Sequence, residues 1–367
     1  MVRKIFSIAA FLITTTFLST PTLAQQNRAK FAVTDRAKAD RDFAFQGEYL
    51  GGVSSHCGFA NFGLQVVALG DGKFEAVLLH GGLPGAGWDR TTRTKLEGQR
   101  DGNILMLDGE SHAVQICSRR ATVAESVSRR TAALSKIHRI SFTQDLAPPS
   151  GAVVLFDGTS TDAFEGGRIS DEGLLEVGPL LKTTVRDFRM HLEFRTPYMP
   201  YARGQGRGNS GVYIQQRYEV QILDSFGLSG VANECGGLYK QQRPAINMCL
   251  PPLSWQTYDI YFTAARFNAA GKRRTPARIT VLHNGELIHT VYDIKAKTGA
   301  GKPEASEARP ILLQNHGNPV NFRNIWLVHG PPKSDLILPG YHPAKSTILK
   351  PRSVSQLLPC RQDIANY

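Results

Sequence analysis

The sequence of 367 residues predicts an all-β protein in which an antiparallel β-sandwich is preceded by a small β domain. Many short segments alternate apolar and polar residues, which is typical of strands with one buried face. Residues 188–196 show this pattern most clearly, with an apolar side chain at every second position. Asn284-Gly285 is the preferred pair for a type I′ hairpin turn, and no segment has the pattern of a convincing long helix. These three observations favour a sandwich.

The first 24 residues are typical of a secretory signal peptide. Arg3 and Lys4 form its basic end, an apolar stretch follows, and small residues up to Ala24 offer a cleavage site. The apolar stretch is short for a membrane span of about 20 residues. We therefore expect no transmembrane span, a periplasmic or secreted mature protein, and an N-terminal extension over residues 25–44.

Residues 45–119 are expected to form the small β domain. Two strand-like segments are joined by Gly70-Asp71-Gly72, which is a strong hairpin signal. A second pair of segments flanks Gly109. The region shows no catalytic constellation.

Residues 120–150 are expected to connect the two domains. Within Ala121–Ile137, an apolar residue recurs at near-helical spacing, at Val123, Val127, Leu134 and Ile137, which predicts one amphipathic helix. The Pro-rich stretch Asp145–Ser150 predicts an exposed linker at the domain boundary. Beyond it, residues 151–330 are rich in strand patterns, and residues 331–367 are expected to be an irregular C-terminal tail.

The formal net charge is +12, and it falls to +10 when Arg3 and Lys4 are removed with the signal peptide. Much of the excess gathers in the connector and immediately before it, at Arg119, Arg120, Arg129, Arg130, Lys136 and Arg139. No nucleic-acid motif accompanies these residues, so we expect a solvated basic surface and no nucleic-acid partner. The alternative is electrostatic adhesion to anionic polymers at a cell surface.

Five cysteines in an exported protein favour disulfides. Proximity along the chain pairs Cys57 with Cys117 and Cys235 with Cys249, which leaves Cys360 alone in the tail. No CxxC pair occurs, which argues against a zinc site.

A row of hydrogen-bonding side chains marks the most informative part of the second domain. In the strand-like segment 218–223 the apolar residues point one way, and Glu219 and Gln221 point the other. With Arg217 before them and Asp224 after them, they form a polar wall suited to gripping a sugar. We expect Arg217 and Gln221 to bind substrate, and Glu219 and Asp224 to be catalytic.

The spacing of Glu219, Gln221 and Asp224 is similar to the E-x-D-x-x-E motif of laminarinase-like enzymes, in which a β-bulge brings three acids to the concave face. Here the middle acid is an amide and the last one is shorter by a methylene. Ordinary retaining hydrolysis needs two carboxyl groups about 5 Å apart. The substitutions therefore argue against that mechanism, and a salt bridge from Glu219 to Arg217 or Arg195 is the structural alternative.

Five blocks follow one another in this part of the chain: NSGVYIQQRYEVQILDS, ECGGLYKQ, WQTYDIYFTAARF, ITVLHNGELIH and ILLQNHGNPVNFRNIWLVHG. Together they resemble the 3-keto-disaccharide hydrolase family, over about residues 151–330. The resemblance implies a jelly-roll sandwich of the concanavalin A-like lectin/glucanase type. It also implies a carbohydrate substrate already oxidised at C3.

Five further residues are candidates for the site. His316 ends a strand beside a glycine and can serve as acid or base near neutral pH, and Gln314 lies on the same strand face. The amide of Asn209 can bind a sugar hydroxyl or make an Asx-turn. Tyr239 can stack on a sugar ring, and Lys240 can polarise a carbonyl oxygen.

The leading hypothesis is an exported enzyme that cleaves 3-keto-glycosides, including 3-keto-disaccharides, by hydrolysis or by β-elimination followed by hydration. Glu219 or His316 would be the base, and the other or Asp224 the acid, with Lys240 or a metal stabilising the enolate oxygen. A divalent ion held by Glu219, Asp224 and His316 would suit this intermediate, although the spacing does not require one. The alternatives are a non-catalytic, lectin-like carbohydrate-binding module and a structural envelope protein.

Overall fold

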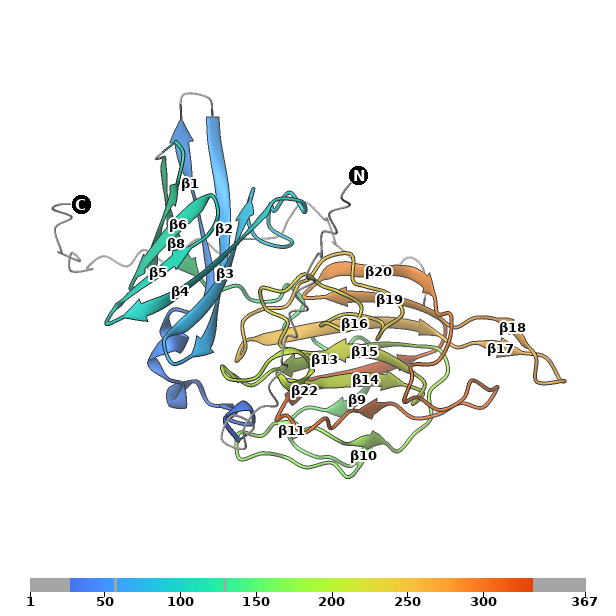
Figure 1. Cartoon of the computed structure of the whole chain (residues 1–367). Coiled ribbons are helices and arrows are strands. Elements are labelled where there is room, and N and C mark those ends of the chain that lie inside the picture. Colours follow the sequence, from blue (N-terminus) through green and yellow to red (C-terminus); the bar gives the residue numbers. More distant parts are fainter. Residues whose placement is uncertain (1–26, 56–57, 129, 333–367) are drawn as a thin grey trace, which may run out of the picture.

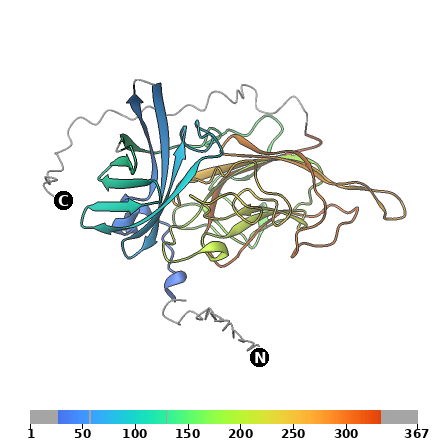
Figure 2. The same ribbon diagram turned by 45° about the horizontal axis from the view of Figure 1, so that its top comes forward.

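The structure is a computed structural model that describes residues 27–55, 58–128 and 130–332, and it is nearly all β. A barrel and a sandwich lie side by side (Figures 1 and 2). The all-β prediction, with a small β domain before a larger antiparallel one, is confirmed. The expected signal peptide, Cys57 and the tail with Cys360 lie outside the described residues. Within the described part, no helix is long and apolar enough to cross a membrane.

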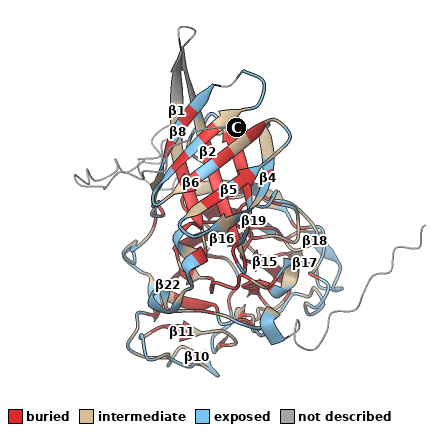
Figure 3. Ribbon diagram, turned by 60° about the vertical axis from the view of Figure 1, so that its left-hand side comes forward, coloured by how far each residue is buried: buried red, intermediate tan, exposed pale blue. Residues whose placement is uncertain are grey.

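The small β domain is a closed barrel in which each strand pairs with the next and the eighth returns to the first. Its strands are β1 (Gly47–Ser55), β2 (Gly58–Gly70), β3 (Lys73–His80), β4 (Arg93–Asp101), β5 (Ile104–Asp108), β6 (His112–Cys117), β7 (Arg120–Glu125) and β8 (Thr131–Ile137). Buried and exposed residues alternate along them (Figure 3). The interior is filled by apolar side chains such as Leu64, Phe74 and Leu105. An eight-stranded barrel is just wide enough for such a packed core.

The helix predicted over Ala121–Ile137 is wrong, because this segment forms β7 and β8. Ala121 and Val123 on β7, and Ala132 and Leu134 on β8, are at most 5% exposed and repeat every second residue. Val127, which the helical spacing would bury, is 92% exposed in the turn between the strands. The period of two therefore describes the segment, and β8 closes the barrel by pairing with β1.

The sandwich packs two antiparallel sheets around one apolar core. One sheet has the order β10-β12-β21-β14-β15. The other has the order β11-β22-β13-β16-β19-β20, with β9 added on β22. A separate ribbon of β17 and β18 projects away from the barrel (Figure 1). The bounds are β9 (Val153–Phe156), β10 (Phe164–Glu165), β11 (Leu175–Glu176), β12 (Leu180–Leu181), β13 (Phe188–Arg195), β14 (Ser210–Ile214), β15 (Tyr218–Ile222), β16 (Trp255–Thr263), β17 (Arg266–Phe267), β18 (Arg273–Thr275), β19 (Arg278–His283), β20 (Glu286–Asp293), β21 (Leu312–Leu313) and β22 (Asn321–His329).

The barrel and the sandwich are joined by more than the linker. Two short 3-10 helices, η1 (Arg36–Lys38) and η2 (Arg41–Ala44), lead into the barrel. Just before them, Val33 forms a β-bridge with Tyr198 of the sandwich. The Tyr198 side chain is fully buried in the apolar core of the barrel, and its hydroxyl donates to Asp40 Oδ1 at 3.0 Å. The two units therefore share a core residue.

The connector lies across the outer face of the neighbouring strands β13 and β16. Thr143 hydrogen-bonds Thr257 at 2.6 Å, and the Asp145 backbone nitrogen donates to Glu193 Oε1 at 2.5 Å. His191 and Glu193 point outward from β13, as the alternation predicts, yet both are 0% exposed. The linker Asp145–Ser150 is thus fixed at its start and exposed from residue 147 onward.

The predicted Cys235–Cys249 disulfide is not formed in this structure. Both residues are free cysteines, both are buried, and their thiols are within hydrogen-bond contact of each other. The Cys235 sulfur also contacts the Tyr258 hydroxyl at 3.2 Å, so polar partners satisfy the reduced thiol. The proposed Cys57–Cys117 pair includes a residue outside the described part of the chain.

Candidate functional site

The polar face predicted around Glu219 exists, and a hairpin builds it. Strands β14 and β15 pair in unbroken register, which sets Tyr213 opposite Glu219 and Gly211 opposite Gln221. The opposite face of both strands, which carries Val212, packs into the sandwich core. Side chains alternate along strands, so Tyr213, Glu219 and Gln221 share the face that points away from the core.

The loop of residues 234–240 extends this face along the free edge of β15. The Tyr239 nitrogen donates to the Glu219 carbonyl at 3.1 Å, and the Gln221 nitrogen donates to the Gly237 carbonyl at 2.9 Å. On the opposite side of the hairpin, the Gln314 nitrogen donates to the Gly211 carbonyl at 2.9 Å. Tyr239 and Gln314 are thereby placed at the two sides of the polar face.

The Glu219 carboxyl is buried over a glycine. Glu219 is 3% exposed, and a Cβ atom on Gly211 would lie 2.5 Å from its Oε1. The absence of a side chain at Gly211 therefore makes room for the carboxyl. Burial raises the pKa of Glu219 to about 7, although a hydrogen bond from Tyr213 partly opposes this rise. Burial, with the Glu219 charge beside it, raises the pKa of Tyr213, which keeps its hydroxyl a proton donor.

Amide groups form a cluster beside this carboxyl. Gln205, in the 3-10 turn η3 (Gly204–Gly206), is its centre: the Gln205 side chain lies 3.0 Å from the Gln221 amide and 3.5 Å from the Tyr239 hydroxyl. Asn209 Nδ2 donates to the Gln205 carbonyl at 2.7 Å. In one orientation of its amide, the Gln221 nitrogen lies 3.1 Å from Glu219 Oε1. The cluster connects Glu219 to Asn209.

Two buried oxygen atoms in this region have no hydrogen-bond partner among the described residues. They are Asn209 Oδ1 and Gln314 Oε1. A buried acceptor without a donor is costly, so both atoms are suited to accept a hydrogen bond from a bound hydroxyl group or water.

Asp224, which we expected to be catalytic, does not lie on the polar face with Glu219. The β-bulge needed to turn it is missing from the β14–β15 pairing, so Asp224 falls on the other parity of the strand. Its Oδ2 accepts from Arg207 Nε at 2.7 Å, and it is 3% exposed. Asp224 is therefore one half of a buried ion pair.

Arg217 is likewise engaged in contacts within the fold. Its guanidinium donates to the backbone carbonyls of Pro303 and Glu307 and to the Glu307 carboxylate, at 2.5–3.0 Å. The side chain is 1% exposed. Arg217, which we expected to bind substrate, thus holds residues 303–307 against the hairpin.

His316 and Lys240 are exposed at the margin of the cluster. The loop of His316 approaches through Asn318, whose Oδ1 accepts from the Asn209 nitrogen at 2.8 Å. The Lys240 ammonium lies 5.5 Å from the centre of the Tyr239 ring. The residues that the structure describes include no group of three His, Cys, Asp or Glu side chains able to hold a metal ion, so Glu219, Asp224 and His316 do not form the site considered from the sequence.

Sequence reasoning missed three residues that contact Glu219 or its neighbours. Tyr213 could have been found, because pairing the two strands across the Gln215-Gln216 turn sets it opposite Glu219. Gln205 and Thr298 carry no such signal. Thr298 Oγ1 accepts from the Glu219 nitrogen at 2.9 Å, but it comes from a loop 79 residues away.

Comparison with known proteins agrees with the resemblance in the sequence. Residues 151–328 match the family model described as a 3-keto-alpha-glucoside-1,2-lyase-like domain. No curated protein matches the chain. Three solved structures of candidate glycosyl hydrolases from Parabacteroides distasonis are similar to it. One is 36% identical over 50% of this chain and 85% of its own, with a TM-score of 0.46. The others are 16% and 20% identical, cover 49% and 48% of this chain and 94% and 98% of their own, and have TM-scores of 0.36 and 0.34.

The match spans both sheets of the sandwich and every residue of the polar face, while the barrel lies before it. Residues 151–328 of the chain therefore belong to the family of 3-keto-alpha-glucoside-1,2-lyase-like domains.

Proposed function

We propose that this protein cleaves 3-keto-glycosides by elimination and hydration, with Glu219 as the general base. A ketone at C3 of the sugar acidifies the proton at C2. Glu219 takes this proton, the C1–oxygen bond breaks, and the departing oxygen receives the proton. Water then adds across the C1–C2 double bond, with its hydroxyl at C1 and its proton at C2. This order of steps needs one base and no pair of ionised carboxylates.

The single observation that carries the proposal is the environment of Glu219. A general base works best when its pKa lies near the working pH, and burial raises the pKa of Glu219 to about 7. An acid of ordinary pKa would be a much weaker base for a carbon-bound proton. Perturbed acids of this kind cluster at functional sites.

The surroundings of Glu219 suit a sugar. The unpartnered oxygens of Asn209 and Gln314 can accept hydrogen bonds from sugar hydroxyls. The half-buried ring of Tyr239 can pack against the apolar face of a pyranose. Lys240, held over that ring, can stabilise the negative oxygen that develops at C3. The signal-peptide pattern of the first 24 residues supports action in the periplasm or outside the cell.

The test compares Glu219→Gln with the wild-type protein on a 3-keto-α-glucoside such as 3-keto-trehalose, with and without chelator. We expect turnover to be lost in the variant and sugar binding to remain. Glu165→Gln is the matched control, because Glu165 is an exposed acid of the same sheet. Full turnover by Glu219→Gln would remove Glu219 from the mechanism. Binding without turnover in both proteins would show a lectin-like module instead.

A further inference from the structure

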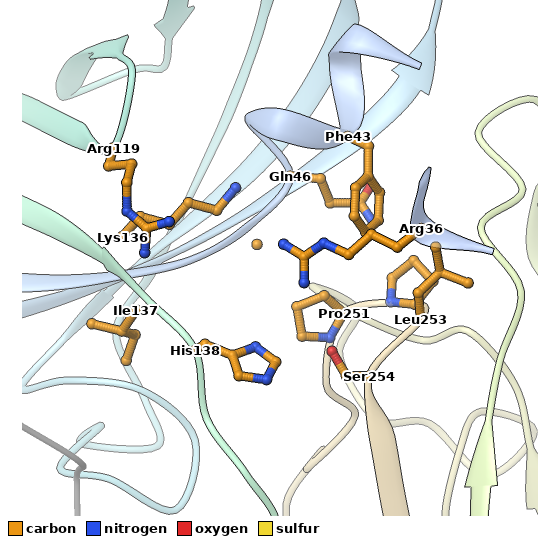
Figure 4. Close-up of a pocket in the computed structure, with 12 residues that line it drawn as sticks. Arg36, Phe43, Gln46, Arg119, Lys136, Ile137, His138, Pro251, Leu253 and Ser254 are labelled. Atoms are coloured by element: carbon orange, nitrogen blue, oxygen red, sulfur yellow. The ribbon is translucent and has the colours of Figure 1, made fainter. Parts of the chain in front are cut away.

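A pocket of about 260 Å³ lies between the barrel and the sandwich, away from the polar face of Glu219. Its walls come from η1 and η2, the start of β1, the β6–β7 turn, the end of β8 and the segment before β16 (Figure 4). The lining residues are Arg36, Phe43, Gln46, Gly47, Arg119, Lys136, Ile137, His138, Pro251, Pro252, Leu253 and Ser254. Ligand sites for drug-sized molecules start at about 300 Å³, so this pocket suits a smaller ligand.

Positive charge dominates the pocket. The guanidinium groups of Arg36 and Arg119 and the ammonium group of Lys136 come from three separate elements and surround a common space (Figure 4). His138 lies at the lower side of the same space. All four side chains are cationic or can become so, and none of the other lining residues is an acid.

No acid among residues 27–55, 58–128 and 130–332 pairs with these cations. The ion pairs within the described residues include none made by Arg36, Arg119 or Lys136. The acid beside the pocket, Glu48, is already bound by Arg139 through both of its oxygens. A cluster of like charges without a counter-ion is unfavourable, and an anion from outside would relieve it.

The environment of Lys136 disfavours its charged form. Burial, together with Arg119 and Arg36, lowers the pKa of Lys136 to about 7. The chain nevertheless makes room for the side chain: a Cβ atom on Gly47 would lie 3.0 Å from Lys136 Cε. Its ammonium donates to the Ala44 carbonyl, which fixes its position at the pocket.

Gln46 adds an uncharged hydrogen-bond donor to the cations of the pocket. Gln46 is 3% exposed, and its Oε1 accepts from the Ala68 nitrogen at 2.9 Å. Its Nε2 is buried and has no partner among the described residues. A buried N–H donor without an acceptor is costly, and a ligand oxygen in the pocket would satisfy it.

From these contacts we propose that the pocket binds a small tetrahedral oxyanion, a phosphate or sulfate group, either free or carried by a molecule of about monosaccharide size. Guanidinium groups bind such oxygens through two parallel hydrogen bonds, and the ammonium group adds a point charge. Residues 251–254 of the sandwich form one wall, so a bound anion would also hold the two units together. This site does not depend on the proposed function.

Isothermal titration calorimetry of the full chain with inorganic phosphate, sulfate and glucose 6-phosphate tests the proposal. Sodium chloride keeps the ionic strength constant and serves as the blank. We expect saturable binding with one site, and Arg119→Gln should weaken it at least about tenfold, because it removes a charge-assisted contact. Arg120→Gln is the matched control: it makes the same charge change at the next residue, which does not line the pocket.

The outcomes distinguish a free anion from a sugar-borne one, and they also test whether the site binds an anion. Tighter binding of glucose 6-phosphate than of inorganic phosphate would indicate a sugar-borne group, and equal binding a free anion. Equal weakening by Arg119→Gln and Arg120→Gln, or no saturable binding of any of the three probes, would overturn the proposal. The charge of sulfate does not change between pH 6.5 and pH 8.5. Over this range Lys136 loses its proton beside Arg36, Arg119, His138 and the Tyr49 ring. Sulfate binding should therefore weaken several-fold from pH 6.5 to pH 8.5. Unchanged sulfate binding between these pH values would also contradict it.

Discussion

Replacing Glu219 by glutamine should make the folded protein more stable above neutral pH. Burial raises the pKa of Glu219 from 4.5 to about 7. At 1.36 kcal/mol per pKa unit, this rise corresponds to about 3 kcal/mol. Below pH 4.5 the acid is protonated in both the folded and the unfolded chain, and no penalty exists. As the pH rises from 4.5 to 7, the unfolded chain ionises first and stability is lost, and above pH 7 the loss is complete.

Glutamine removes this penalty and keeps an oxygen that can accept from Tyr213. We therefore expect Glu219→Gln to increase the free energy of unfolding by up to about 3 kcal/mol at pH 8.5 and to leave it nearly unchanged at pH 4.5. Urea denaturation at both pH values measures this difference. The exposed control Glu165→Gln should change neither value by more than about 0.5 kcal/mol. An equal effect of Glu219→Gln at both pH values, or a loss of stability at pH 8.5, would refute the reasoning.

Three further outcomes are expected. Tyr213→Phe removes a hydrogen bond to the Glu219 carboxylate, so the acid limb of the kcat/KM profile on a 3-keto-glucoside should move to higher pH by about one unit; a shift to lower pH would contradict the contact. Asp224→Asn leaves the Arg207 charge buried without its partner, so urea denaturation should show a loss of about 3–5 kcal/mol, while the pH profile of turnover in the folded protein stays the same. Limited proteolysis should cut within Ala147–Ser150, where the chain is exposed, and the two fragments should elute together in size-exclusion chromatography; separate elution would show that the shared core is weaker than the structure indicates.

The strands of the barrel could be predicted where a local turn joins them. Gly70-Asp71-Gly72 predicts the β2–β3 hairpin, and the segments around Gly109 form β5 and β6. Closure could not be predicted, because it depends on the distant pairing of β8 with β1. The segment of β7 and β8 shows why. Val123, Val127, Leu134 and Ile137 fit a helix by spacing alone, and only packing inside the barrel selects the period of two.

The candidate site was predictable to the extent that one hairpin determines it. Alternation of side chains within 218–223 places Glu219 and Gln221 on one face of the strand. Continuing this alternation to Asp224 places it on the opposite face, unless a β-bulge intervenes. The amide cluster includes Gln205, and the backbone nitrogen of Glu219 donates to Thr298. These two residues come from loops that precede and follow the hairpin in the sequence. Contacts of that kind arise from the folding of distant loops and leave no local pattern.

The shared residue Tyr198 has a consequence for the order in which the chain acquires its structure. During synthesis the barrel strands are complete by residue 137, long before Tyr198 emerges. N-terminal domains usually fold first, yet this barrel lacks one of its core side chains and the bridge to Val33 until the sandwich segment arrives. A truncated barrel should thus remain loosely packed and prone to associate with other chains. Final consolidation of both units would then be a late step, set by contacts of high sequence separation and correspondingly slow.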